Sequence, residues 1–259
     1  GQPCDNISHK HDYYTELTGI YWAWKNLRKL YPDVKYVGWS HYRRFFAFDE
    51  QKYFATFIHK HESAIRDYRV NAEKVIKILE SGKIIVHKRL VFPCNVGLQF
   101  CACHSSSDYR LVEETIMKKF PDYYDDFQYV MNNNNKLASC CMFIMKYEDF
   151  DKYCEWLFSV LAEIEPVIIS RYSNTPQNRI LGYIAERLMD VYIRKNRIRT
   201  KHLNVYFYGE TGENKNPMRN FLSYIHRFLN TSKYNIAMFI LNLNLRPFRT
   251  LLKKSPKKP

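Results

Sequence analysis

The sequence predicts an α/β fold: a single domain with a mixed central sheet flanked by helices, followed by a basic amphipathic helical tail. The clearest observation is the stretch 71–86, which reads as a helix, a tight glycine turn and a buried strand, the unit of an α/β sheet. Asn71 suits the start of this helix, and Gly82 suits the left-handed position just past its end. Apolar periodicity over 149–165 and 177–195 adds two amphipathic helices that can cover a sheet. With 46% hydrophobic residues, the 259-residue chain can form one substantial core or two small lobes.

The segments before residue 71 are less regular. Apolar residues at helical spacing predict a helix over 12–30, which Asp12 can cap and Pro32 closes. Residues 36–40 then read as a short apolar and aromatic strand. Residues 49–65 have a helical but variable pattern.

The later segments alternate between helices and strands. A serine after His104 can cap a helix that runs to Phe120, and Pro121 can start a short helix after it. Beyond residue 82 the sequence predicts strands over 84–86, 137–145 and 203–208. It also predicts helices over 109–120 and 121–131, in addition to the amphipathic helices at 149–165 and 177–195.

The cysteine pattern argues against a zinc-binding protein and against a disulfide-rich protein. All seven are irregularly spaced and none forms a C-x-x-C pair, so neither a thiolate zinc site nor a disulfide framework is expected. A reducing cytoplasm is the simplest compartment for such a chain. The chain opens on Gly1 in polar sequence without a signal segment, so we expect a processed or truncated start.

The charge is concentrated at the C-terminal end. The net charge is +14, and residues 214–259 contain ten Lys or Arg residues but no Asp or Glu. We therefore divide the chain into a globular domain at 1–212 and a basic tail at 213–259. The two apolar stretches within 221–245 are shorter than the roughly 20 residues of a membrane span, and fit an interfacial amphipathic helix better. Charge alone leaves anionic lipid and nucleic acid open as partners of this tail.

A histidine and two arginines follow the strand at 36–40. Ligands of α/β sheets bind at the carboxyl ends of strands, where His41, Arg43 and Arg44 would lie. A pair of guanidinium groups suits a multiply charged anion such as a diphosphate, because each presents a fixed fork of donors. The alternative is that the two arginines form only a solvated turn.

The order of motifs resembles a bacterial family of capsular and exopolysaccharide glycosyltransferases that was long described only as a domain of unknown function. The resemblance runs from about Asp5 to Tyr208. It rests on these motifs: Asp5-Asn6-Ile7-Ser8, Glu16-Leu17-Thr18, Tyr21-Trp22-Ala23-Trp24-Lys25-Asn26, His41-Tyr42-Arg43-Arg44-Phe45, His104 with Asp108, Met142-Phe143-Ile144-Met145-Lys146, Tyr153-Cys154-Glu155-Trp156-Leu157-Phe158, Arg179 with Gly182-Tyr183, and Glu186-Arg187-Leu188.

Two departures from the family pattern bear on the site. Family members carry a further strand and loop before the Asp-Asn-Ile-Ser motif, so part of the donor-nucleotide pocket is expected to be missing here. The family also tends to have Asn where this chain has Cys141.

The resemblance implies a GT-A-like fold, a nucleotide-sugar donor that is UDP-linked, and a lipid-linked oligosaccharide acceptor in capsular, exopolysaccharide or O-antigen synthesis. Some relatives are thought to transfer galactofuranose. The expected location is cytoplasmic, peripheral at the inner face of the plasma membrane, with the basic tail on the anionic surface. Many GT-A enzymes hold Mn or Mg with an Asp-x-Asp motif after the corresponding strand. No clear motif of this kind stands here, since Asp122 and Asp125-Asp126 lie on a predicted helix.

The resemblance and the chemistry together give a set of candidate site residues. We expect positive charge from arginine in place of a metal ion, and contacts to donor sugar, ribose or phosphate from polar side chains. The donor-binding candidates are Asp5, Asn6, Ser8, Glu16, Trp24, Lys25, Asn26, His41, Arg43, Arg44 and Arg179. For each of them, capping, core packing or a surface ion pair is the alternative.

An inverting transfer also needs a carboxylate base on the acceptor side. The catalytic candidates are Asp108, with His104 near it, and Glu186, which lies between Arg179 and Arg187. Asp108 can instead cap its helix, Glu186 can simply pair with an arginine, and a lone histidine is more often structural.

Two functions without catalysis remain as alternatives, a nucleic-acid-binding protein and a membrane-surface protein. The basic tail and the 16% aromatic content would suit nucleic acid. The aromatic residues, however, recur at helical core spacing and are not interleaved with Lys and Arg, so no nucleic-acid partner is expected. A membrane-surface protein would explain the tail but not the polar motifs at 5–26 and 41–44.

Overall fold

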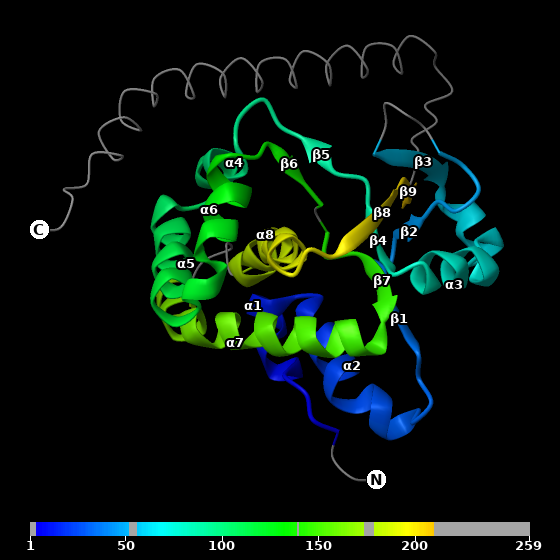
Figure 1. Cartoon of the computed structure of the whole chain (residues 1–259), viewed down its shortest axis with the longest axis horizontal. Coiled ribbons are helices and arrows are strands. Elements are labelled where there is room, and N and C mark those ends of the chain that lie inside the picture. Colours follow the sequence, from blue (N-terminus) through cyan, green and yellow to red (C-terminus); the bar gives the residue numbers. More distant parts are fainter. Residues whose placement is uncertain (1–3, 52–55, 139, 174–178, 210–259) are drawn as a thin grey trace, which may run out of the picture.

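A four-stranded mixed sheet divides the protein into two packed halves (Figure 1). The computed structural model describes residues 4–51, 56–138, 140–173 and 179–209. The strand order is β1-β7-β4-β8, with β7 antiparallel to both neighbours and β4 parallel to β8. The strands of this sheet are β1 (Tyr36–Trp39), β4 (Lys83–His87), β7 (Phe143–Lys146) and β8 (Arg199–Leu203).

A second, three-stranded sheet lies beside the first and has the order β2-β9-β3. Its central strand is antiparallel to β2 and parallel to β3. The three strands are β2 (Arg44–Phe46), β3 (Phe57–His61) and β9 (Val205–Gly209), and a small antiparallel pair joins β5 (Leu90–Val91) to β6 (Lys136–Leu137).

Helices make up most of the remaining described chain. They are η1 (Ser8–Lys10), α1 (His11–Tyr14), α2 (Leu17–Leu30), η2 (Glu62–Asp67), α3 (Ala72–Glu80), α4 (Val96–Cys103), α5 (Ser106–Lys119), η3 (Pro121–Tyr123), α6 (Tyr124–Asn132), α7 (Tyr147–Tyr172) and α8 (Ile180–Lys195). In this part of the chain no helix combines the length and the apolar character needed to cross a membrane.

The residues of β4 show how the sheet separates two hydrophobic cores. Ile84 and Val86 face the larger core, which contains the apolar sides of α2, α7 and α8. Ile85, between them, faces the smaller core, where it meets α3 and the three-stranded sheet. Successive side chains of β4 therefore point to opposite faces of the sheet, and both faces are buried. The predicted α/β fold with a mixed sheet flanked by helices is therefore confirmed.

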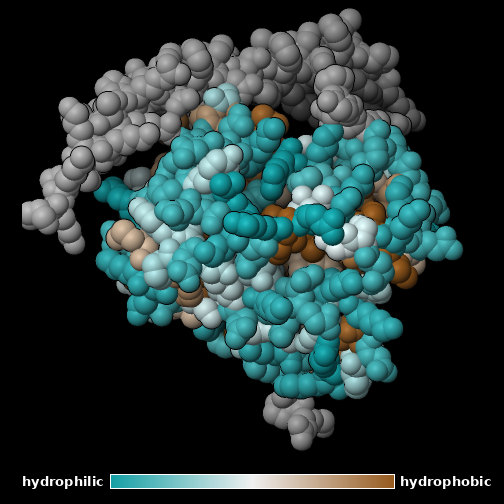
Figure 2. Space-filling model, in the orientation of Figure 1, coloured by the Kyte–Doolittle hydropathy of each residue, from teal (hydrophilic) through white to brown (hydrophobic). Residues whose placement is uncertain are grey.

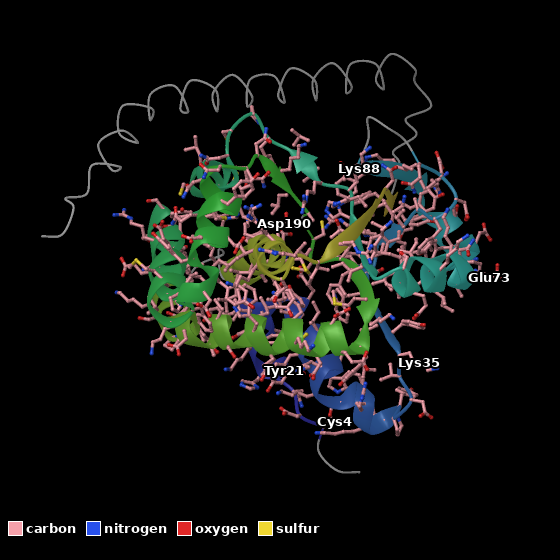
Figure 3. All side chains as sticks on the ribbon, viewed as in Figure 1. Cys4, Tyr21, Lys35, Glu73, Lys88 and Asp190 are labelled. Atoms are coloured by element: carbon pink, nitrogen blue, oxygen red, sulfur yellow. The ribbon has the colours of Figure 1, made fainter. Side chains whose placement is uncertain are left out.

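The helix–turn–strand unit at 71–86 forms as predicted. The Asn71 side chain accepts a hydrogen bond from the backbone N–H of Lys74 at 3.0 Å, and Gly82 has a φ of 74°. Several side chains of this half, such as Glu73, lie at the periphery, whereas Asp190 on α8 lies inside the molecule (Figure 3). The face seen in Figure 2 is mostly hydrophilic, with hydrophobic residues grouped near its middle.

Four predicted elements were wrong in part. The helix predicted over 12–30 is interrupted at Thr15, so that Asp12 lies inside α1 and does not cap α2. The helical pattern at 49–65 proves to contain β3, whose pairing with β9 overrides local preference. The strand predicted over 137–145 is broken at Cys140 and Cys141, and the apolar segment 203–208 belongs to two strands that meet at Asn204.

The other later elements differ mainly at their ends. The predicted helices at 109–120 and 121–131 correspond to α5 and to η3 with α6, while α7 runs further than the predicted 149–165. The start of the predicted 177–195 helix and the basic tail at 213–259 lie outside the described residues, so the domain boundary at 212 stays a prediction.

Candidate active site

A cavity of about 600 Å³ opens where β1 ends and α8 begins. Its volume is in the range of small-molecule sites, roughly 300–1,000 Å³. It brings together residues that are distant in sequence, from the α1–α2 junction, the β1–β2 loop, the first turns of α8, and β9. The lining residues are His11, Asp12, Thr15, Glu16, His41, Tyr42, Arg43, Arg44, Arg179, Gly182, Tyr183, Glu186 and Phe207.

One wall of the cavity is a stripe along α8. Arg179, Gly182, Tyr183 and Glu186 are spaced three or four residues apart and therefore share one face of the helix. Gly182 lets this face approach the opposite wall, since a Cβ atom there would lie 3.0 Å from Thr15 Oγ1. The stripe thus combines a cation, an aromatic ring and a carboxylate on one surface.

The opposite wall is shaped by a break between α1 and α2. Thr15 has a φ of 48°, a region that β-branched residues rarely adopt, and it ends α1 after four residues. Its hydroxyl donates a 2.6 Å hydrogen bond to Glu16 Oε2, while its carbonyl accepts from the Thr18 hydroxyl at 2.8 Å. The chain therefore changes direction at Thr15, between α1 and α2. Glu16, which directly precedes α2, lines the cavity at this break.

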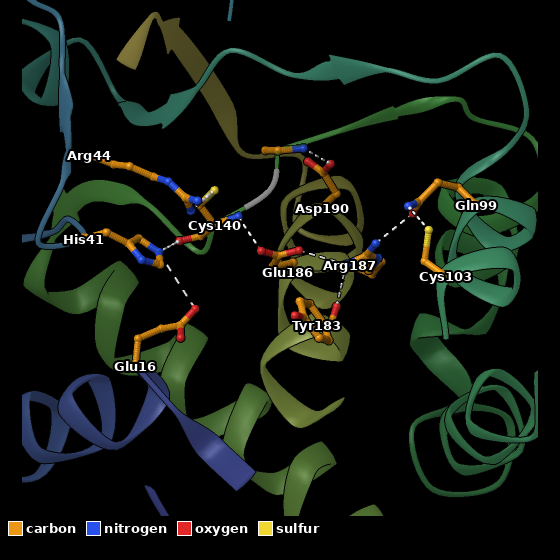
Figure 4. A network of polar contacts seen from close by, with 11 residues as sticks. Glu16, His41, Arg44, Gln99, Cys103, Cys140, Tyr183, Glu186, Arg187 and Asp190 are labelled. Atoms are coloured by element: carbon orange, nitrogen blue, oxygen red, sulfur yellow. Dashed lines mark hydrogen bonds and ion pairs between the residues drawn. The ribbon is translucent and has the colours of Figure 1, made fainter. Parts of the chain in front are cut away.

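Cys140 is buried behind the cavity lining and contacts three of the lining residues (Figure 4). Its backbone N–H donates to Glu186 Oε1 at 2.7 Å, and its carbonyl lies 2.7 Å from His41 Nε2. Its sulfur lies 2.9 Å from Arg44 Nη1. Because a carbonyl oxygen can only accept, His41 must carry its proton on Nε2. Glu16 Oε1 lies 3.8 Å from the same nitrogen.

Backbone strain gathers at this cavity. Of the four non-glycine residues with positive φ in the described chain, Thr15 lines the cavity and Cys140 contacts three lining residues, while Cys141 follows Cys140 in the core and the fourth is Arg197. Each such conformation costs about 1–3 kcal/mol and persists where the surroundings impose it, which is often at a functional site. The strain therefore supports a functional cavity independently of its charges.

Three arginines, Arg43, Arg44 and Arg179, line the cavity together with the carboxyl groups of Asp12, Glu16 and Glu186. Within the described ranges, none of the guanidinium groups of Arg43, Arg44 and Arg179 forms an ion pair with a carboxylate. Arg43 is exposed, with its guanidinium 5.1 Å from the Tyr42 ring, whereas Arg44 is half-buried at 5.7 Å from the Phe207 ring. Such groups suit an anionic ligand with several oxygen atoms.

Glu186 is the carboxylate most enclosed by this arrangement. Its Oε2 accepts a 2.8 Å hydrogen bond from Arg187, which also donates to the carbonyl of Tyr183 and to Gln99 Oε1. Burial raises the pKa of Glu186, and the charge of Glu16 acts in the same direction, against the opposing effects of Arg187 and the Cys140 N–H. A carboxylate with a raised pKa is a stronger base than an ordinary glutamate.

Six of the predicted site residues meet at this cavity: Glu16, His41, Arg43, Arg44, Arg179 and Glu186. The predicted donor-binding residues at 5–8 do not line it. Ser8 N–H donates to Asn6 Oδ1 at 3.1 Å in a local turn, and Asp5 accepts from the Tyr21 hydroxyl at 3.4 Å.

The predicted donor-binding residues on α2 also lie elsewhere. Trp24 packs parallel to Phe158 of α7 at 5.6 Å between ring centroids, and its Nε1 donates to Asp151 at 2.7 Å. Lys25 Nζ lies 3.3 Å from the centroid of the Trp24 ring. Asn26 is buried and donates to the carbonyl of Asp5 at 2.7 Å. These contacts fix α2 against α7 and the N-terminal segment.

Two of the predicted catalytic residues have structural contacts outside the cavity. Asp108 is fully buried in the first turn of α5, where it pairs with Arg171 and accepts from the Tyr172 hydroxyl at 2.5 Å. His104 stacks on Tyr183, with 4.3 Å between ring centroids. Burial, together with the charge of Arg187, lowers the pKa of His104 to about 4. Neither residue lines the cavity, so the catalytic roles expected of Asp108 and His104 stay predictions.

Sequence reasoning missed several lining residues, chiefly the aromatic ones, Tyr42, Tyr183 and Phe207. A signal existed for Tyr183, because it lies on the same helical face as Arg179 and Glu186. Phe207 had none, since its position depends on β9 pairing with β2. In the part of the chain that is described, no group of three or more His, Cys, Asp or Glu residues could hold a metal ion.

Comparison with known proteins relates this arrangement to a family. Residues 2–197 match the family described as "Domain of unknown function (DUF4422)". A solved structure, the apo form of the WbbM bifunctional glycosyltransferase, is similar with a TM-score of 0.69 and 29% sequence identity. The similarity covers 81% of this chain but only 39% of that one, so this chain corresponds to less than half of the WbbM protein. No curated protein matches.

Proposed function

The chain belongs to the family described as Domain of unknown function (DUF4422), and we propose that it is a glycosyltransferase of polysaccharide synthesis. In this proposal it transfers a sugar from a nucleotide-sugar donor to a glycan acceptor. The observation that carries the proposal is a cavity with one enclosed carboxylate, Glu186, and three guanidinium groups that form no ion pair with any acidic residue in the described part of the chain. The likeness to a solved bifunctional glycosyltransferase at 29% identity supports it.

The two sets of charges fit the two halves of a glycosyl transfer. As an acceptor hydroxyl attacks the anomeric carbon, the bond from that carbon to the diphosphate oxygen breaks and the diphosphate leaves with its electron pair. Arg43, Arg44 and Arg179 stabilise the negative charge of this leaving group, in the role that a metal ion has in many related enzymes. Glu186 takes the proton of the attacking hydroxyl. Its ion pair with Arg187 and its bond from Cys140 hold the carboxylate in place.

The remaining roles follow from position. His41 and Glu16, on the wall facing α8, orient donor or acceptor hydroxyls. The finer assignments come from the family resemblance and the charge of the chain. They are a GT-A-like fold, a UDP-linked donor with UDP-galactofuranose as the first to test, a lipid-linked acceptor, and a basic tail at 213–259 that associates with the inner face of the membrane.

Thermal unfolding with candidate donors tests the proposal. UDP, UDP-galactofuranose, UDP-galactopyranose and UDP-glucose would be added to the full chain with and without manganese. A ligand at about 100 times its Kd stabilises the folded state by about 2.7 kcal/mol. For a domain of this size, such a gain corresponds to a rise in Tm of roughly 5–10 °C. We expect this rise for at least one UDP compound without metal.

Two variants make the test specific. Arg43→Ala removes an exposed cavity cation and should abolish most of the rise, whereas Arg110→Ala removes an exposed cation on α5, away from the cavity, and should keep it. The proposal fails when no nucleotide sugar shifts the Tm of the parent chain, or when the two variants respond alike.

A further inference from the structure

The geometry points to a carbohydrate platform on α8: we propose that Tyr183, backed by the ring of His104, stacks against a sugar ring of the acceptor glycan. This inference rests on the proposed function, because the acceptor is defined by the transfer reaction. It gives Tyr183, which has no role in the proposed transfer step, a ligand of its own: a sugar ring.

Tyr183 has the exposure and the support that such a platform needs. Tyr183 is 39% exposed, although it lies on a helix whose other residues are mostly buried, and it lines the cavity. His104 covers one face of the ring, with 4.3 Å between centroids and 27° between planes. Phe100 in turn lies 4.9 Å from His104. Ligand pockets are concave and are commonly lined by aromatic side chains.

The support behind Tyr183 is uncharged and fixed. With a pKa lowered to about 4, His104 is a neutral imidazole at neutral pH, and it packs as a ring without drawing water or counter-ions to the stack. Arg187 donates a 2.9 Å hydrogen bond to the carbonyl of Tyr183, which holds this turn of α8. The face of an aromatic ring is electron-rich, and the C–H bonds on one side of a sugar ring are suited to pack against it.

The position of Tyr183 favours the acceptor over the nucleotide. Tyr183 and Glu186 are three residues apart on one helical face, so their side chains are neighbours, about 5–6 Å between Cβ atoms. A sugar on Tyr183 would therefore present a hydroxyl to the proposed base. Of the three proposed phosphate-binding arginines, Arg179 lies one turn before Tyr183, but Arg43 and Arg44 lie across the cavity, before and at the start of β2. There the ring of Tyr42, which is 78% exposed, lies 5.1 Å from the Arg43 guanidinium and is available to a nucleobase.

The experiment compares glycoside and nucleotide binding in variants of the full chain. Saturation-transfer NMR with octyl galactopyranoside, glucopyranoside and mannopyranoside, in the presence of saturating UDP, detects weak sugar binding, and calorimetry measures UDP. We expect at least one glycoside to bind the parent chain. Tyr183→Phe should bind it equally well, whereas Tyr183→Leu should weaken binding about tenfold, the upper part of the range for an aromatic pair. UDP affinity should stay within about twofold in both variants, a difference well under 1 kcal/mol.

Four results would overturn the inference, and together they separate it from the proposed function. When UDP binds but none of the glycosides does, or when Tyr183→Leu binds a glycoside as tightly as the parent, the platform is absent while the transferase proposal stands. When Tyr183→Leu loses UDP affinity and Tyr42→Leu does not, the ring binds the nucleobase. A parent chain that fails to bind any UDP compound defeats the proposed function and the inference together. Circular dichroism of Tyr183→Leu checks that the variant is folded.

Discussion

Acidification is expected to weaken the fold through His104, and the His104→Phe variant isolates this effect. The histidine is held between Tyr183 and Phe100, with a pKa of about 4 in the folded state, while an unfolded chain gives it an ordinary pKa near 6.5. Between these two values the unfolded chain binds a proton that the folded protein does not. The free energy of unfolding must therefore fall as the pH drops from above about 6.5 toward about 4.

The size of the effect follows from this difference in pKa. From about pH 8 to about pH 5, full linkage would cost roughly 2 kcal/mol, and about 1 kcal/mol remains once the partial exposure of His104 is allowed for. In a domain of this size, 1 kcal/mol lowers Tm by about 3 °C. Phe at this position keeps a stacked ring and has no proton to gain, so His104→Phe should lack this component.

Urea unfolding at several pH values measures the difference. Many carboxylates titrate in the same range, so the quantity of interest is the change in parent stability minus the change in His104→Phe stability. We expect the parent to lose about 1 kcal/mol more than the variant between the two pH values. Equal losses in both proteins would show that His104 titrates as freely when folded as when unfolded, and the neutral stack behind Tyr183 would be refuted.

Three further changes test other parts of the structure. Asp108→Asn should lower the free energy of unfolding in urea by about 2–4 kcal/mol, because it breaks a buried pair with Arg171, while the Tm rise with UDP stays unchanged. Asn26→Ala should cost about 1–2 kcal/mol in the same assay through its lost bond to the Asp5 carbonyl, again without an effect on UDP binding. In a pH–rate profile, the acid limb should lie above the ordinary glutamate pKa of about 4.3, since activity needs the ionised form of Glu186. A limb at the ordinary value would argue against Glu186 as the base.

The sequence predicted correctly those elements whose formation depends only on their own residues. The unit at 71–86 has a capping side chain, an apolar helical face and a glycine in the left-handed position, and it folds as these features predict. β3 was missed because its residues favour a strand only when β9, far along the chain, pairs with it. The turn at Cys140 and Cys141 contains no glycine or asparagine, so no local feature indicated the positive φ values.

The charged residues of the candidate site could be predicted from the sequence. The arginines after β1 and the carboxylate of Glu186 could be chosen from chemistry and motif order, and they meet in one cavity. The motif residues on α2, by contrast, were grouped by their place in the sequence. The direction of that helix could not be read in advance, because Trp24 turns toward Phe158 and Asp151 of α7. Tyr183 was missed because an aromatic ring at helical spacing is usually part of a core.

The pairing of β9 between β2 and β3 affects the order in which the walls of the cavity can form during synthesis. The Tyr208 N–H donates to the carbonyl of Arg43 at 2.8 Å, and the Ala47 N–H donates to the carbonyl of Asn204 at the same distance. The loop with the two arginines is thus held by the last strand described, beyond residue 197, where the family match ends. During synthesis the ribosome must release residues 205–209 before this loop is secured. A nascent chain that ended at residue 197 would already contain Glu186 on α8, while the loop with Arg43 would still lack its hydrogen bond from β9.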